Sequence, residues 1–261
     1  MPNWCTQIVK LTAKNDVAKK QIHTFIDKHI VKNSKADWRG SFFDIDNESL
    51  IPIPEGIEKL KQMGQILQCD DGSIKTNHNY SKEAEEEQRK KNLKEYGYDD
   101  WYHFCLDKWG SKWGFCSPEF VNEYNEPLES ISDIHDSLDK NGYLEFKAYS
   151  AWSSPLGLMQ KICELYPDIE FRGEWGEEQV TEYYGVITYD KENGGKQVTK
   201  DDMDVDEAYN MLDRLGLLSA DQDDGYFVNR EKGIIDYDER LDENSDNYIP
   251  EYREKLIGCE H

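Results

Sequence analysis

The chain has 261 residues, of which 54 are acidic and 31 are Lys or Arg, giving a formal net charge of −23 at pH 7. A field of this sign repels nucleic-acid phosphates and anionic lipid, so it argues against direct nucleic-acid binding and against membrane attachment. No apolar run approaches the ~20 residues of a membrane span, and the N-terminus lacks a secretory pattern. Aromatic residues make up 12% of the chain, which predicts a folded cytoplasmic protein rather than a disordered acidic one.

In the first half of the chain, residue spacing predicts alternating strands and helices. Residues 5–12 alternate in polarity like a strand, and Asn15 or Asp16 can cap a helix that follows. The segment 81–95 is highly charged and has no apolar stripe, which predicts a solvated helix or a mobile insert. The remaining predicted elements are a strand at 41–45, a helix at 55–68 and a loop at 70–80.

The second half begins with a section dense in aromatic residues. Ser153 or Ser154 is predicted to cap a helix with Pro155 at its first position, ending near Tyr166. The other predicted helices are 99–109, 128–138 and 204–215. The predicted strands are 112–116 (as a strand start), 143–150, 169–175 and 181–189, with a hairpin near 226–237.

Two strand–helix–strand units, one at each end of residues 1–190, predict an α+β fold. The arrangement fits the ferredoxin-like split βαβ sandwich, an antiparallel sheet with helices on one face. Residues 201–261 hold 19 acidic and 6 basic residues, so the composition changes near 193–201. We therefore predict a domain at 1–195 with a charged insert near 70–95, and an acidic region at 196–261 that either docks on the core or extends from it.

The six cysteines are scattered and form no CxxC pair, which is typical of reduced intracellular thiols. His103, Cys105, Cys116 and His135 come nearest to a metal-ligand set. Only His103 and Cys105 are close in sequence, and on a helix their side chains point apart. No metal and no cofactor are predicted.

Several motifs occur in a characteristic order along the chain. They are Met1-Pro2-Asn3-Trp4-Cys5, Ile51-Pro52-Ile53-Pro54, Trp101-Tyr102, the run from Trp109 to Gly114 (WGSKWG), the run from Ala151 to Pro155 (AWSSP), and Gly173-Glu174-Trp175-Gly176 with Gly185 beyond. Over residues 1–190 this order resembles the YubB-like ferredoxin-domain family of phage and plasmid proteins. The resemblance implies a ferredoxin-like fold and a mobile-element origin in a bacterial cytoplasm. It implies no reaction.

The motifs supply one set of candidate ligand-binding residues. Large aromatics with glycines beside them are typical of a core. With convergent charges, the same residues can instead line a pocket for a small polar molecule, such as a nucleotide base with its phosphate. The candidates are Trp4, Trp109, Lys112, Trp113, Trp152 and Glu174.

No Ser/His/Asp pattern, phosphate loop or dinucleotide fingerprint is present. Pro2 is a weak catalytic candidate, because removal of Met1 would expose a secondary amine of the kind that tautomerase-like enzymes use as a base. The sequence therefore favours a protein that is not an enzyme.

The acidic C-terminal region supplies the other candidate set. Its carboxylates form a solubilising surface or imitate the phosphates of a nucleic acid and so attract a basic protein. The second reading predicts an inhibitor of a host protein, above all a nucleic-acid-binding component of antiviral defence. The candidates are Asp201, Asp202, Asp204, Asp221, Asp223, Asp224, Asp236, Asp238 and Asp242.

Overall fold

The structure is a computed structural model. It describes residues 3–63, 66–68, 74–76, 81–122, 126–178, 183–218, 224–229 and 231–242, and the single residues 245, 247 and 249. Its helices are α1 (Asp16–His29), α2 (Asn47–Leu50), α3 (Glu55–Met63), α4 (Lys82–Tyr96), α5 (Trp101–Lys108), α6 (Ile131–Asn141), α7 (Leu156–Leu165), the 3₁₀ turn η1 (Lys200–Asp202) and α8 (Val205–Leu215). Within these residues no helix is long and apolar enough to cross a bilayer.

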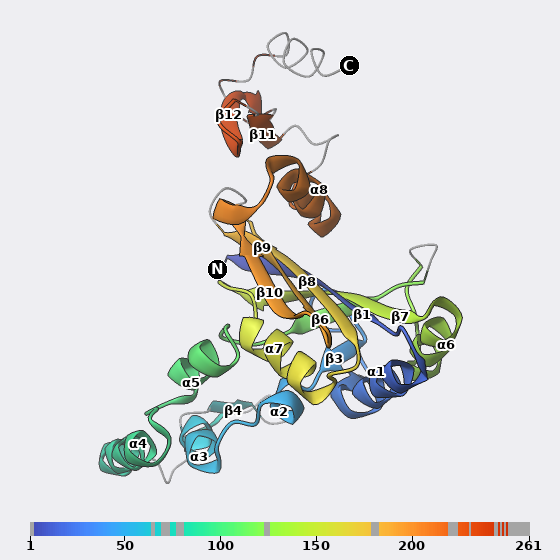
Figure 1. Ribbon diagram of the computed structural model, residues 1–261. Helices are drawn as coiled ribbons and strands as arrows, with labels where there is room; N and C mark the ends of the chain where they lie inside the picture. Colours follow the sequence, from blue (N-terminus) through green and yellow to red (C-terminus); the bar gives the residue numbers. More distant parts are fainter. Residues whose placement is uncertain are drawn as a thin grey trace.

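An antiparallel six-stranded sheet organises the molecule (Figure 1). Its strands lie in the order β10-β9-β8-β1-β7-β6. They are β1 (Trp4–Thr12), β6 (Cys116–Phe120), β7 (Tyr143–Ala151), β8 (Glu170–Glu177), β9 (Tyr184–Asp190) and β10 (Gly194–Thr199). Three two-stranded sheets complete the set: β2 (Ile30–Lys32) with β3 (Phe43–Ile45), β4 (Ile66–Gln68) with β5 (Ile74–Thr76), and β11 (Asp224–Asn229) with β12 (Ile234–Asp242).

The four strands β8-β1-β7-β6 and the helices between them have the ferredoxin-like topology. β1 leads through α1 to β6, and β7 separates these two strands in the sheet. β7 leads through α7 to β8, and β1 separates that pair. These are two interleaved split βαβ units, so the predicted fold class is confirmed.

The alternation along β1 decides what each face of the sheet buries. Cys5, Val9 and Leu11 belong to the main core, to which α1 and α7 contribute Phe25 and Met159. Ile8 lies on the opposite face and packs in a second core. That core is built largely from α8, and its buried members include Ala208, Met211, Leu212, Leu215 and Val186. Part of the acidic C-terminal region therefore docks on the sheet.

Several predicted boundaries were wrong. The helix expected at 55–68 ends at Met63, and residues 66–68 are strand β4. The expected loop at 70–80 contains strand β5, and its other residues lie outside the described part of the chain. Pro155 precedes α7 as its N-cap, without a side-chain cap from Ser153 or Ser154.

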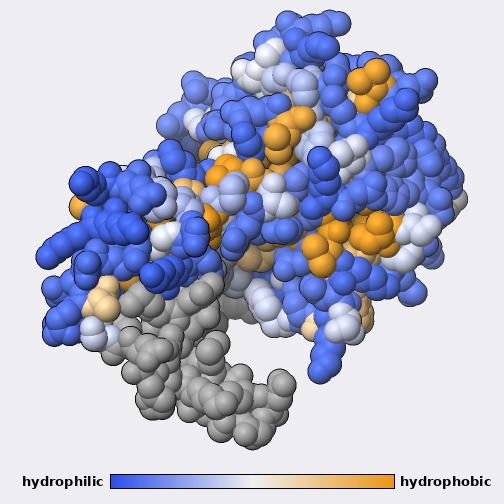
Figure 2. Space-filling view, turned by 90° about the horizontal axis from the view of Figure 1, so that it is seen from below, coloured by the Kyte–Doolittle hydropathy of each residue, from blue (hydrophilic) through white to orange (hydrophobic). Residues whose placement is uncertain are grey.

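Figure 2 views the molecule from below, the side on which Figure 1 places α2 and α3. Its surface there is mostly hydrophilic, with hydrophobic residues in separate groups. The charged helix α4 buries Asn92, whose Nδ2 donates to the Gly56 carbonyl of α3 at 3.0 Å. A Cβ atom on Gly56 would lie 2.6 Å from the Asn92 oxygen, so glycine permits this contact. The predicted solvated helix is thus anchored on α3.

Candidate functional site

Exposed tryptophans gather at one end of the central strands. Of the seven tryptophans, the three exposed ones are Trp38 (65%), Trp113 (37%) and Trp152 (41%). Trp4, at the start of β1, links two of them: its ring centroid lies 4.9 Å from that of Trp38 and 5.9 Å from that of Trp113. Large aromatic side chains exposed at one place are typical of a binding surface.

Two cations lie among these rings. The Arg39 guanidinium is 3.7 Å from the Tyr149 ring centroid and 4.4 Å from that of Trp38. The Lys112 ammonium is 4.7 Å from the Trp113 centroid and 4.9 Å from that of Trp152. These are cation–π distances. We name the whole group the aromatic–cationic cluster; its members are Trp4, Trp38, Arg39, Lys112, Trp113, Tyr149 and Trp152.

The two cations also have no carboxylate partner among the described residues. Within the described residues, neither Arg39 nor Lys112 forms an ion pair with a carboxylate, although the chain carries a net charge of −23. The Arg39 Nε is also buried with no hydrogen-bond partner. An Arg and a Lys held over aromatic rings and free of carboxylates are available to an anion.

Strained backbone holds Trp152 in place. Its φ of 65° lies in the left-handed region, where a bulky side chain costs about 1–3 kcal/mol. The Trp152 N–H donates to the Asn3 carbonyl at 2.8 Å, and the Ser153 hydroxyl donates to the Gly110 carbonyl at 2.6 Å. These bonds tie the end of β7 to the start of β1 and to the turn before Lys112, so the cluster is positioned before any ligand arrives.

The loop that carries Trp38 and Arg39 is also held. The Asp37 carboxylate accepts from the Arg39 and Ser41 N–H groups at 2.9 and 3.0 Å. The Ser41 hydroxyl donates to the Pro118 carbonyl at 2.6 Å and so attaches this loop to β6. Between the loop and β6 lies a groove of about 860 Å³, lined by Arg39, Phe42, Pro118 and Glu119 among others.

Tyr149 joins the cluster to the sheet. Burial and the nearby Glu119 carboxylate raise the pKa of its hydroxyl to about 12, against the opposing effect of Arg39. The hydroxyl therefore stays protonated at neutral pH and donates to Glu119 at 3.0 Å. This fixes the ring beneath Arg39.

Four of the six ligand-binding candidates lie together here: Trp4, Lys112, Trp113 and Trp152. Trp109 does not join them. It is buried in the main core, with its Nε1 donating to the Ile51 carbonyl at 2.9 Å. Glu174, the other candidate outside the cluster, is buried in β8, where it bonds Arg172 and Arg214. Trp109 thus has the core position that the sequence also allowed, and neither residue belongs to the cluster, because the elements that cover a side chain decide whether it stays exposed.

Trp38, Arg39 and Tyr149 were missed. The signal available was Trp38-Arg39-Gly40, an aromatic and a cation before a glycine with φ of 92° in a turn. Loops of this kind often carry binding residues. The sequence did not show that this turn meets the first residues of β1.

The acidic candidates divide into groups. Asp201 and Asp202 are exposed in η1, and Asp204 caps α8 by accepting from two backbone N–H groups. In the β11–β12 hairpin three candidates have neutralising or hydrogen-bonding partners: Asp236 pairs with Lys232, Asp238 with Arg240, and Asp242 accepts from Tyr237. Asp224 begins β11, while Asp221, Asp223 and the catalytic candidate Pro2 lie outside the described residues.

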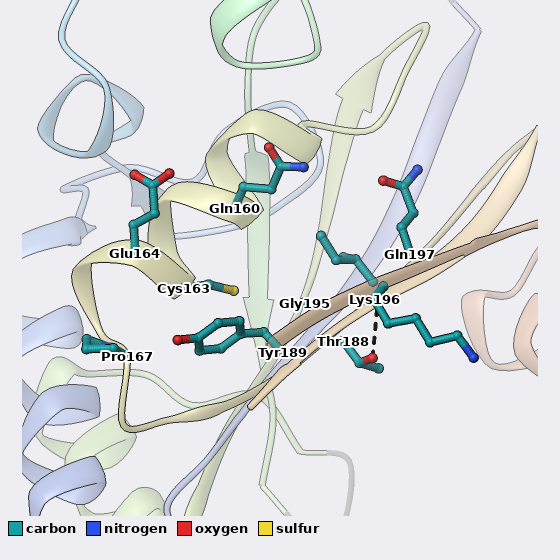
Figure 3. A pocket seen from close by; sticks show the side chains of 10 residues that line it. Gln160, Cys163, Glu164, Pro167, Thr188, Tyr189, Gly195, Lys196 and Gln197 are labelled. Carbon is teal, nitrogen blue, oxygen red and sulfur yellow. Dashed lines mark hydrogen bonds between the residues drawn. The ribbon is translucent and has the colours of Figure 1, made fainter. Parts of the chain in front are cut away.

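A second cavity, of about 400 Å³, lies between α7 and the β9–β10 hairpin (Figure 3). Cys163 from α7, Tyr189 from β9 and Lys196 from β10 line it. Burial raises the pKa of the Cys163 thiol to about 12, so it stays protonated and is a poor nucleophile. This cavity therefore has no activated nucleophile at Cys163 and fewer aromatic side chains than the aromatic–cationic cluster.

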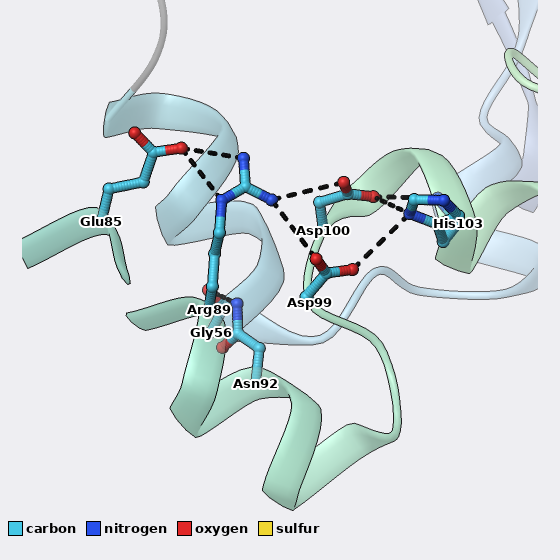
Figure 4. Close-up of polar contacts among 7 residues, drawn as sticks. All are labelled: Gly56, Glu85, Arg89, Asn92, Asp99, Asp100 and His103. Atoms are coloured by element: carbon cyan, nitrogen blue, oxygen red, sulfur yellow. Dashed lines mark hydrogen bonds and ion pairs between the residues drawn. The ribbon is translucent and has the colours of Figure 1, made fainter. Parts of the chain in front are cut away.

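Asp99, Asp100 and His103 place three metal-type ligand atoms close together (Figure 4). Arg89 from α4 already contacts both carboxylates, at 3.7 and 3.4 Å, and the His103 Nδ1 lies 3.0 Å from Asp100. Hydrogen bonds from His103 and Arg89 help to lower the pKa of Asp100 against the opposing effect of burial. The group therefore joins α4 to α5 as an ion-pair network.

Comparisons with known proteins bear on the fold. A family described as "Ferredoxin-like domain in Api92-like protein" matches residues 123–215. A solved structure, protein api92 from Yersinia pseudotuberculosis, is similar over 76% of this chain and 98% of its own, at 10% identity and a TM-score of 0.32. Curated protein sequences give no match. The family match and the strand order together show that the chain contains a ferredoxin-like domain, and residues 123–215 are similar to the Api92-like family.

Proposed function

We propose that this protein binds a nucleotide, or a closely related molecule with a planar base and a phosphate, at the aromatic–cationic cluster. Exposed Trp38 and Trp152 supply surfaces on which a base can stack. Arg39 and Lys112 supply positive charge for the phosphate. The observation that carries the proposal is a pair of cations with no carboxylate partner in the described part of the chain, among three exposed tryptophans, although the net charge is −23.

The geometry favours one molecule over an extended nucleic acid. The surrounding acidic surface repels a long phosphate backbone, whereas a single phosphate needs only the local positive charge. The groove of about 860 Å³ beside Arg39 is large enough for a mononucleotide. Binding therefore needs both the stacking surfaces and the two cations.

Calorimetric titration with AMP, adenosine and ribose 5-phosphate tests this proposal. We expect AMP to bind more tightly than either fragment. In Trp38→Ala, AMP affinity should fall about tenfold, because a base stacked on an aromatic ring contributes about 1–3 kcal/mol. In Arg39→Ala or Lys112→Ala, AMP should bind no better than adenosine.

Lys20→Ala is the matched control, since Lys20 is an exposed lysine on α1, away from the cluster. It should bind AMP like the unaltered protein. Equal AMP affinity in Trp38→Ala and the unaltered protein would contradict the proposal.

A second function rests on Asp201 and Asp202, which are exposed beside the docked helix α8. We propose that the acidic surface around η1 binds a basic, nucleic-acid-binding host protein, as an inhibitor of antiviral defence would. The mobile-element origin implied by the YubB-like resemblance supports this reading. The partnered aspartates of the β11–β12 hairpin make η1 the better candidate contact.

Capture from nuclease-treated bacterial lysate tests this second function. A nucleic-acid enzyme should be retained at low salt and released at high salt. The double variant Asp201→Asn/Asp202→Asn should retain less of it, whereas Asp236→Asn should retain as much as the unaltered protein. A partner that binds the double variant equally well would contradict the role of η1.

A further inference from the structure

Two histidines from different helices face each other at the edge of the molecule. His23 lies on α1 and His135 on α6, and the two helices are neighbours (Figure 1). Their Nδ1 atoms are 2.6 Å apart, while the ring centroids are 4.9 Å apart with 25° between the planes. Because the centroids are much farther apart than the nearest nitrogens, the rings meet edge to edge, with the two Nδ1 atoms directed at each other.

The opposite nitrogen of each ring contacts a carboxylate of the other helix. The Nε2 of His23 lies 3.2 Å from Asp139, and the Nε2 of His135 lies 3.0 Å from Asp27. In both helices the aspartate follows its histidine by four residues, so the two groups share a helix face. The result is a crossed arrangement of carboxylate, imidazole, imidazole and carboxylate.

This arrangement is the one found around metal-bound histidines. A carboxylate that accepts from Nε2–H fixes the tautomer and leaves the Nδ1 lone pair for a metal ion. Here both rings have such a carboxylate, and both lone pairs converge on one point between the helices. Lys19 bonds Asp139 at 2.8 Å and helps to hold that carboxylate in place.

We propose that His23 and His135 bind a divalent transition-metal ion such as zinc through their Nδ1 atoms. Zn–N bonds measure about 2.0–2.1 Å. To bind one tetrahedral ion, the two Nδ1 atoms therefore need to move apart by less than about 1 Å from their present 2.6 Å. The ion lies between the two Nδ1 atoms, and water completes its coordination. The side chains are 28% and 24% exposed, so the ion enters directly from solvent.

The site does not depend on the proposed nucleotide function. It joins α1 to α6, whereas the aromatic–cationic cluster is built from β1, β7 and the loops before β3 and β6. It also differs from the group at His103, where Arg89 already contacts both carboxylates. His103 therefore provides a matched control.

Calorimetric titration of the full chain with zinc chloride tests the proposal. We expect one zinc ion per chain, with affinity at least tenfold lower in His23→Ala and in His135→Ala. Asp27→Asn should retain the stoichiometry and weaken binding severalfold, because Asp27 only orients His135. His103→Ala should stay within twofold of the unaltered protein.

Nitrogen NMR of the histidine side chains gives the second readout. Zinc should shift the Nδ1 resonances of His23 and His135 and leave that of His103 in place. If an alanine variant does not fold, His135→Gln replaces it, since glutamine retains a polar group beside Asp27. Equal zinc affinity in the unaltered protein and in a folded variant at position 23 or 135 would overturn the proposal, as would unchanged Nδ1 resonances with zinc in excess.

Discussion

At the scale of single residues, His29 is a buried ionisable side chain with a hydrogen-bond partner at each ring nitrogen. Its ring is buried, with Nδ1 2.5 Å from the Ser49 hydroxyl and Nε2 2.7 Å from the Tyr166 hydroxyl. Burial lowers the pKa of His29, and the Lys28 ammonium lowers it further. The folded protein therefore favours the neutral form of the His29 ring.

We expect the free energy of unfolding to fall as the pH is lowered from about 7 to about 5. Below the ordinary histidine pKa of about 6.5 the unfolded chain binds a proton at this position, while the folded chain does so only at lower pH. Urea unfolding at a series of pH values measures this dependence. His29→Gln should be less stable at pH 7, and the slope of its free energy of unfolding against pH should be smaller.

Lys20→Gln is the control for that slope, because Lys20 is an exposed lysine on α1 and lysine side chains ordinarily titrate well above pH 7. A slope in His29→Gln equal to that of the unaltered protein would show that other groups cause the pH dependence.

At the scale of elements, one buried carboxylate attaches α8 to the sheet. Glu174 in β8 lies on the same face as Ile8 and accepts from Arg214 of α8 at 2.5 and 3.2 Å. Arg172 also donates to it, at 2.7 Å. Burial of a carboxylate is tolerated only when it is paired, so α8 and β8 depend on each other.

Arg214→Met should therefore destabilise the protein by about 1.5–3 kcal/mol, the range for a hydrogen bond to a charged group. Amide hydrogen exchange should speed up in α8 more than in α1. Lys161→Met, which removes an exposed ion pair with Glu164, should change stability by less than about 0.5 kcal/mol. Equal effects of the two variants would mean that α8 is held by its apolar face alone.

At the scale of the whole molecule, the net charge of −23 opposes compaction. Salt screens this repulsion, because the Debye length falls from about 10 Å at 0.1 M to about 3 Å at 1 M. We expect the free energy of unfolding, measured with urea at pH 7.5, to rise with NaCl over this range. AMP binding at Arg39 and Lys112 should weaken over the same range, and a stability that falls with salt would contradict the first expectation.

The sequence by itself determined the periodicities and the fold class. Alternation in residues 5–12 and 143–150 and helical spacing in α1 and α7 follow from local geometry, and two split βαβ units allow few topologies. The WGSKWG and AWSSP runs also located Lys112, Trp113 and Trp152 of the aromatic–cationic cluster. These features depend on residues close together in the chain.

Only the tertiary structure decided which side chains meet. Periodicity tells which face of an element a residue occupies, but not what covers that face. Hence Trp109 is core while Trp113 is exposed, and Glu174 pairs with an arginine 40 residues away. Arg39 contacts Trp4, and His23 contacts His135, because strand register and helix packing bring them together. Both depend on contacts between segments that are distant in the sequence.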